Sequence, residues 1–171
     1  MTTSPVEFPQ VGGCGCEQVR YQLTSDPLSV YACHCIDCQT MTGASFFLSM
    51  IVRRESIVLL KGEPHPREYS LPDGRQRAAY VCTECLVSLW TEHPGFPDLY
   101  TLRAGTLDEA SWVRPVAHLF IRSVQPWIAI PPGDLRYEGN PDDLAALFEA
   151  WKSRVRTSSG ATQRSGPADS A

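Results

Sequence analysis

The chain has 171 residues, of which 43% are hydrophobic, which is enough for one domain with an apolar core. Its formal net charge of −4 disfavours nucleic acid as a partner, because binding the phosphate backbone requires a basic face. The first residues lack the basic and apolar regions of a secretion signal, and no apolar run is long enough to cross a bilayer. We therefore expect a cytoplasmic protein that does not contact a membrane.

Residues 1–10 are expected to form an N-terminal arm, and residues 11–138 a single β domain. Cys14 and Cys16 flank a glycine and precede an alternating run, 19–23, which predicts a turn that leads into a strand. Disulfides are rare in a reducing compartment, so the seven cysteines of the chain are better explained as metal ligands or reactive thiols. The alternative for Cys14 and Cys16 is two small buried apolar residues.

Three cysteines follow within six residues, at Cys33, Cys35 and Cys38. This C-x-C-x-x-C spacing can wrap one zinc ion, and three protein ligands with an open position are typical of catalytic zinc. His34 is expected to point away from the ion if the chain is extended there. The alternative is a purely structural site that His34 or a distant residue closes.

The middle of the chain predicts further strands, separated by Gly, Pro and charged turns. The composition of residues 72–74 predicts a hairpin turn. The predicted strands are residues 46–52, 57–60, 67–71, 76–81, 99–102 and 118–124.

Cys82 and Cys85 have the spacing of a zinc knuckle. The central three cysteines plus either pair would give five ligands, one too many for tetrahedral zinc, whereas the two pairs together give four. Cys14, Cys16, Cys82 and Cys85 are therefore predicted to form a closed structural site, which leaves the central three as a separate site. A redox pair at Cys82 and Cys85 is the alternative, although no βαβ pattern surrounds them.

Three other residues could serve the central site. His93 and His118 could be fourth ligands or proton carriers, although such histidines more often form ordinary hydrogen bonds near the surface. Asp37 could orient a ligand or accept a proton, and it could equally be an ordinary turn residue.

Residues 139–156 predict a helix, because Asn140 is a suitable N-cap and Pro141 suits the first position. Its apolar stripe should pack on the sheet, and packing against a second subunit in a homodimer is the alternative. The stripe consists of Leu144, Leu147, Phe148, Trp151 and Val155. Residues 157–171 are rich in Ser, Gly, Thr and Pro and are expected to form a disordered tail.

With its cysteines placed, the chain resembles the glutathione-dependent formaldehyde-activating enzyme family, which includes the domain of centromere protein V. The resemblance covers roughly residues 11–130, and the complete cysteine pattern is specific although each piece alone is not. The matching segments, in chain order, are Gly12-Gly13-Cys14-Gly15-Cys16, Val19-Arg20-Tyr21, Cys33-His34-Cys35-Ile36-Asp37-Cys38 with Gly43 and Phe46, Cys82-Thr83-Glu84-Cys85, Gly105-Thr106-Leu107-Asp108 and Trp127.

The resemblance implies a mainly β fold of zinc-stabilised antiparallel sheets, β-tent-like, with one C-terminal helix. It implies two zinc ions per chain: a structural ion on the outer four cysteines, and a labile catalytic ion on Cys33, Cys35 and Cys38. The implied activity is that of a carbon-sulfur lyase which joins or splits formaldehyde, or a similar aldehyde, and a small thiol such as glutathione. The alternatives from other classes are a non-catalytic zinc module that binds a protein partner and a thiol or metal sensor.

The sequence departs from the family pattern at three places. Glu17 and Leu86 stand where the family usually has glycine, and Gln39-Thr40 replaces a basic pair that often follows the third central cysteine. The last departure predicts a less positive rim around the central site, which disfavours an anionic tripeptide.

Overall fold

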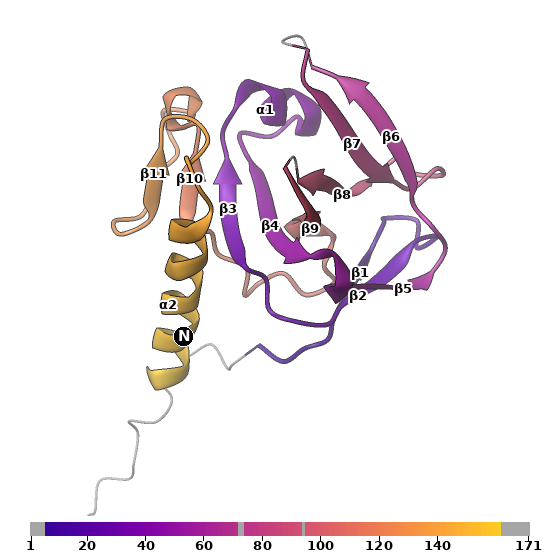
Figure 1. Ribbon diagram of the computed structural model, residues 1–171, viewed down its shortest axis with the longest axis horizontal. Coiled ribbons are helices and arrows are strands. Elements are labelled where there is room, and N and C mark those ends of the chain that lie inside the picture. The colour runs from indigo at the N-terminus through magenta and orange to yellow at the C-terminus, as the bar shows by residue number, and fades with distance from the viewer. Residues whose placement is uncertain (1–5, 72–73, 94, 162–171) are drawn as a thin grey trace, which may run out of the picture.

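The computed structural model of the chain describes residues 6–71, 74–93 and 95–161. Over these residues the chain forms two β-sheets and two α-helices, and short 3₁₀ turns lie at Arg54–Ser56, Ala104–Thr106 and Ile121–Ser123 (Figure 1). The predicted class, a mainly β protein with a C-terminal helix, is confirmed. In the part of the chain that the structure describes, no helix is long and apolar enough to cross a membrane.

The smaller sheet consists of β1 (Gln10–Gly13), β2 (Arg20–Leu23) and β5 (Ile57–Lys61), all antiparallel. β1 lies close to the rest of the protein at Gly12, where an added Cβ would stand 2.5 Å from the carbonyl oxygen of Thr106 and 2.7 Å from the ring of Tyr21. Glycine is therefore required at this position by the close approach of two backbones.

The larger sheet has eight strands in the order β11-β10-β3-β4-β9-β8-β7-β6. These strands are β3 (Ser29–Cys33), β4 (Phe47–Arg53), β6 (His65–Ser70), β7 (Gln76–Val81), β8 (Ser88–His93), β9 (Phe96–Arg103), β10 (Ala117–Leu119) and β11 (Leu135–Tyr137). β10 pairs in parallel with both β3 and β11, whereas the expectation was for antiparallel pairing. Parallel strands need a crossover connection, and the long segment after β9 provides one by carrying the chain back before β10 begins. The hydrogen bond from the Val116 N–H to the Val30 carbonyl then holds β10 beside β3.

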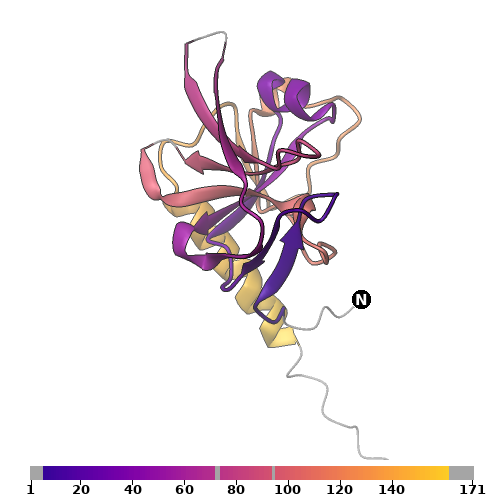
Figure 2. The same cartoon turned by 90° about the vertical axis from the view of Figure 1, so that its right-hand side faces the viewer.

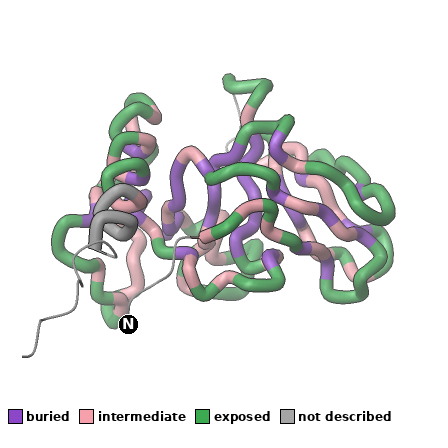
Figure 3. Tube along the Cα trace, turned by 90° about the horizontal axis from the view of Figure 1, so that it is seen from below, coloured by how far each residue is buried: buried purple, intermediate pink, exposed green. Residues whose placement is uncertain are grey.

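The main core lies between the two sheets. Tyr21 and Leu23 of β2 face Met50, Trp90 and Leu102 of the larger sheet, and all five are buried. The rings of Tyr21 and Trp90 meet edge to face, with centroids 5.8 Å apart. Seen from below, buried segments run along the strands and exposed ones along the turns (Figure 3).

The C-terminal helix α2 (Ala145–Ala161) packs against β3, and Figure 2 shows it alongside the β-sheets. Leu147 is fully buried with Ile51 and Ala117 in a second, smaller core. All five residues of the predicted apolar stripe pack into one of the two cores, as expected for a helix that covers its own sheet.

The helix boundaries differ from the prediction of 139–156. The Asp143 carboxylate accepts a hydrogen bond of 2.6 Å from the Ala145 N–H, so Asp143 rather than Asn140 caps the helix. The helix also continues to Ala161, past the predicted start of the tail at residue 157. Residues 162–171 lie outside the described part of the chain.

The predicted strand 118–124 is also shorter in the structure. β10 ends at Leu119, and Phe120 has a left-handed backbone conformation with a φ of 58°. A residue in this conformation cannot continue a strand, so the chain turns into the 3₁₀ segment that follows.

Candidate metal centres

The first group of thiols joins two turns that are far apart in the sequence. The four sulfur atoms of Cys14, Cys16, Cys82 and Cys85 all lie within 4.8 Å of one another. The Sγ of Cys16 is 3.5 Å from that of Cys14 and 3.7 Å from that of Cys82. A tetrahedral zinc with Zn–S bonds of about 2.3 Å requires sulfur–sulfur edges of about 3.8 Å, whereas a disulfide requires about 2.05 Å. The spacing of these free thiols therefore fits a four-coordinate zinc.

Both turns are closed by backbone hydrogen bonds. The Glu17 N–H donates to the Cys14 carbonyl over 3.1 Å, and the Leu86 N–H donates to the Cys82 carbonyl over 3.0 Å. Glu17 and Leu86 have φ values of 59° and 60°, in the left-handed region that favours glycine. The two positions where the sequence departs from the family's usual glycine are therefore the two where the turn requires a positive φ.

The second group of thiols is local in sequence. Cys33 is the last residue of β3, Cys35 is the N-cap of the helix α1 (Ile36–Thr42), and Cys38 lies in the first turn of that helix. The Sγ atoms of Cys33 and Cys35 are 3.6 Å apart, and Cys38 N–H donates to the Cys35 Sγ over 3.3 Å. α1 was not predicted, because its seven residues are too few to show a periodic apolar face.

The ionisation of these three thiols is strongly coupled. Cys33 and Cys38, together with backbone N–H groups at Asp37 and Cys38, lower the pKa of Cys35 well below its usual range. Cys35 in turn raises the pKa of Cys33 to about 12, and its two thiol neighbours raise the pKa of Cys38. Three thiolates so close together repel one another, and a divalent cation would remove that repulsion. The donor set therefore fits a zinc ion with three protein ligands.

His34 points away from the thiols, as expected for extended chain. It is completely buried, and its Nε2 lies 2.9 Å from the Nδ1 of His118, with the two rings stacked. The Nε2 of His118 is 3.4 Å from a carboxylate oxygen of Asp134, whose other oxygen accepts 2.6 Å from Arg154 on α2. Burial lowers the pKa of both histidines, so both are neutral at pH 7. His118 is thus the hydrogen-bonding partner of His34 rather than a fourth metal ligand.

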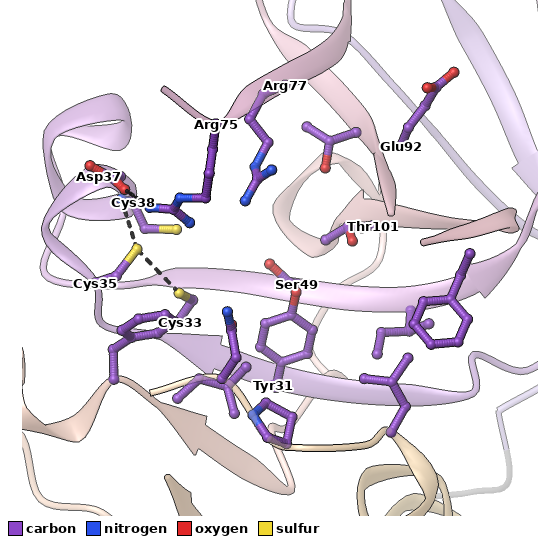
Figure 4. A pocket seen from close by; sticks show the side chains of 18 of the residues that line it. Tyr31, Cys33, Cys35, Asp37, Cys38, Ser49, Arg75, Arg77, Glu92 and Thr101 are labelled. Carbon is purple, nitrogen blue, oxygen red and sulfur yellow. Dashed lines mark hydrogen bonds and ion pairs between the residues drawn. The ribbon is translucent and has the colours of Figure 1, made fainter. Parts of the chain in front are cut away.

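The three-Cys group opens onto a cavity of about 560 Å³ on one face of the larger sheet (Figure 4). Cross-strand pairing aligns Cys33 with Phe47, and Tyr31 with Ser49 and Arg103, so these side chains share that face. Burial raises the pKa of the Tyr31 hydroxyl to about 12, which keeps it protonated as a hydrogen-bond donor. The four-Cys group does not line this cavity.

The rim of the cavity carries more positive charge than the sequence predicted. In Figure 4, Arg75, just before β7, points toward the three-Cys group, and Arg77 of β7 points into the cavity. Arg75 forms an ion pair of 3.2 Å with Asp37 of α1, which gives Asp37 a partner other than the metal ligands. Arg103 lies deeper in the same cavity. The residues next to Cys38 in the sequence gave no sign of these arginines, because strand pairing rather than sequence proximity places them at the cavity.

The remaining predicted candidates lie as follows. All seven cysteines gather into the two predicted groups, and whether these bind zinc stays a prediction. The side chain of His93 lies outside the described part of the structure.

A fold of two sheets with one four-thiol and one three-thiol group defines a class of mainly β protein with the capacity for two metal ions. The family profile described as glutathione-dependent formaldehyde-activating enzyme matches residues 9–123. The chain therefore belongs to this family, and membership supports a formaldehyde-activating, glutathione-related function.

Among solved structures, the chain is similar to a crystal structure of a Rhodobacter sphaeroides protein. The two are 13% identical with a TM-score of 0.46, over 74% of this chain and 98% of the other. The comparison with curated proteins gave no match.

Proposed function

We propose that this protein is a zinc-dependent carbon-sulfur lyase. It joins or splits an aldehyde, formaldehyde or a similar one, and a small thiol such as glutathione. The observation that supports this most is the difference between the two thiol groups, because only the three-Cys group lines the cavity of about 560 Å³. Three ligands beside a cavity suit a catalytic zinc, whereas four ligands within the fold suit a structural one.

Cys33, Cys35 and Cys38 would hold the catalytic ion, and Cys14, Cys16, Cys82 and Cys85 the structural one. A zinc ion bound at the three thiols would supply Lewis acidity and favour thiolate over thiol at neutral pH. In the synthetic direction the substrate thiol loses its proton, its sulfur bonds to the carbonyl carbon, and the carbonyl oxygen gains a proton. The reverse direction breaks that carbon–sulfur bond and releases both reactants.

The chain's own residues would prepare the cavity for this reaction. The Asp37–Arg75 ion pair connects α1 to the β6–β7 hairpin beside the thiols, and both lie at the same end of the molecule (Figures 1 and 2). The hydroxyl groups of Tyr31, Ser49 and Thr101 line the cavity and can donate hydrogen bonds to a bound oxygen. Holding the two reactants side by side is itself a substantial source of rate acceleration.

The test is the exchange of formaldehyde with glutathione, cysteine and 3-mercaptopropionate, followed by NMR on zinc-replete protein. We expect exchange above the uncatalysed rate, loss of that acceleration in Cys35→Ser, and its retention in Thr83→Ala. Thr83 is exposed in the Cys82–Cys85 turn and is not a predicted ligand. No acceleration with any of the three thiols would favour the non-catalytic module that binds a protein partner, or the thiol or metal sensor.

A further inference from the structure

Arg103 is a buried arginine at the end of β9. Only 6% of its surface is exposed, and it pairs with Ser49 across the strands. Its position on the cavity face is fixed by the alternation of side chains along β9, since its neighbour Leu102 points into the main core.

The direct contacts of Arg103 are all with neutral groups, and the thiols of Cys38 and Cys33 interact with its charge only through space. Nε donates to the Ser88 Oγ over 3.3 Å, Nη2 lies 3.8 Å from the Met41 Sδ, and Cζ is 3.7 Å above the ring of Phe47. Among the described residues, no carboxylate forms an ion pair with Arg103. A buried charge without a counter-charge costs several kcal/mol, so such a group usually has an anionic partner.

Other arginines of this protein show the usual arrangement. Arg154 binds Asp134 over 2.6 Å, Arg20 binds Asp108, and Arg75 binds Asp37. Arg103 is more buried than any of these three and yet has only the neutral contacts described above. Its guanidinium therefore keeps hydrogen-bonding capacity for an anionic group that binds from outside the chain.

Arg103 is also placed where a ligand can reach it. It lines the cavity of the three-Cys group and a second cavity of about 710 Å³, with Met41 and Tyr69 also common to both. Two carboxylates of the first cavity have partners other than Arg103: Asp37 forms an ion pair with Arg75, and Glu92 accepts a hydrogen bond of 2.9 Å from Tyr80. Asp142 and Asp143 line the same cavity from the segment before α2.

We propose that Arg103 is a specificity-determining residue that binds the carboxylate of the substrate thiol within the cavity. The planar guanidinium can donate two parallel hydrogen bonds to a carboxylate, and Tyr31 and Ser49 lie on the same face to donate others. This inference rests on the proposed function for the presence of a thiol substrate. The competing role for Arg103 is to balance the negative charge of the three thiolates.

The test compares two ligands that differ only in charge, 3-mercaptopropionate and 3-mercaptopropionamide, by calorimetry on the zinc-loaded full chain. For the wild type we expect the carboxylate to bind roughly 10- to 100-fold more tightly, the range given by losing a charged hydrogen bond. In Arg103→Gln this preference should fall to about 3-fold or less, with the zinc content unchanged. Arg103→Lys should keep part of the preference, because lysine keeps the positive charge but lacks the planar guanidinium group. Arg53→Gln, on exposed Arg53 of β4, is the matched control and should keep the full preference.

Three outcomes overturn the proposal. Equal affinities of the wild type for the two ligands, or a carboxylate preference that survives in Arg103→Gln, would show that Arg103 does not bind the carboxylate. Loss of zinc from the three-Cys group in Arg103→Gln would assign it to balancing thiolate charge. If Arg103→Gln does not fold, the wild-type comparison and Arg103→Lys decide the question. A carboxylate preference without accelerated adduct exchange would refute the proposed reaction and leave the role of Arg103 standing.

Discussion

Replacing one ligand in each thiol group should separate their roles, because the two groups close chain segments of very different length. Cys16 and Cys82 are 66 residues apart, whereas Cys33 and Cys38 are five apart. The entropy of loop closure grows as (3/2)RT ln n, so the outer four-Cys site constrains the unfolded chain by about 2.3 kcal/mol more than the central one. Metal binding at the outer site is accordingly coupled more strongly to folding.

We therefore expect Cys85→Ser to be less stable than Cys35→Ser by at least about 2 kcal/mol. For a chain of this size, that corresponds to a difference in Tm of about 4–8 °C. Cys85 also packs against the main core, and its partners Cys14 and Cys82 are buried in it, which adds to the loss. Cys35→Ser should lose one zinc ion and any lyase activity while keeping most of its thermal stability.

The assay is thermal unfolding combined with native mass spectrometry for zinc content, with Thr83→Ala as the control that should match the wild type. If Cys35→Ser melts as low as Cys85→Ser, the central zinc is structural as well. The difference between the two sites, on which the proposed reaction depends, would then be lost.

The turn residue Leu86, the two thiol groups and the buried Tyr21 each give a further test. Leu86→Gly should stabilise the protein by roughly 0.5–1 kcal/mol in urea unfolding, because the strain relieved at its positive φ exceeds the cost of the extra freedom of glycine in the unfolded chain. The control Leu60→Gly, in strand β5, carries only that cost and should destabilise the protein. Native mass spectrometry with increasing chelator should remove two zinc ions in separate steps, and their simultaneous loss would argue against two unlike sites. Burial raises the pKa of Tyr21, so the unfolded state ionises first: the free energy of unfolding should fall as the pH rises above about 10, and Tyr21→Phe should show a shallower fall.

Much of the fold and the grouping of the cysteines could be predicted from the sequence. Apolar runs bounded by Gly, Pro and charged turns located most of the central strands, and counting ligands separated the four-Cys group from the three-Cys group. These predictions succeeded because a strand is marked by its own local sequence, and because the number of ligands around a tetrahedral zinc is fixed at four.

The remaining features depend on long-range register, which single segments do not encode. The parallel pairing of β10 is set by a long connection, and Arg103 reaches the cavity only because β9 pairs with β4. In the sequence, Arg103 is simply an arginine at the end of an apolar strand, and such a residue cannot be distinguished from one on the surface. The buried His34–His118 contact likewise required β3 and β10 to be neighbours.

Gln39 shows why a departure from the family pattern need not remove charge from the site. Its side-chain Nε2 donates to the carbonyls of His34 and Ser123, over 2.7 and 2.8 Å, and its Oε1 accepts 2.7 Å from Gln125. The residue therefore fastens α1 to the segment after β10, and the positive charge of the cavity comes from the arginines of β7 and β9 instead.

A lysine at position 39 could donate to the two carbonyls but could not accept from Gln125, which would leave a partly buried donor without a partner. We expect Gln39→Lys to lower the free energy of unfolding by about 1–2 kcal/mol, the usual cost of such a lost hydrogen bond. Thr40→Lys, at the exposed neighbouring position, should change it by no more than about 0.5 kcal/mol. Urea unfolding of the two variants makes the comparison, and equal stabilities would show that the three hydrogen bonds of Gln39 do not hold α1 in place. If Thr40→Lys binds 3-mercaptopropionate more tightly than the wild type and Gln39→Lys is unstable, the rim of the cavity accepts added positive charge only where no structural contact is broken.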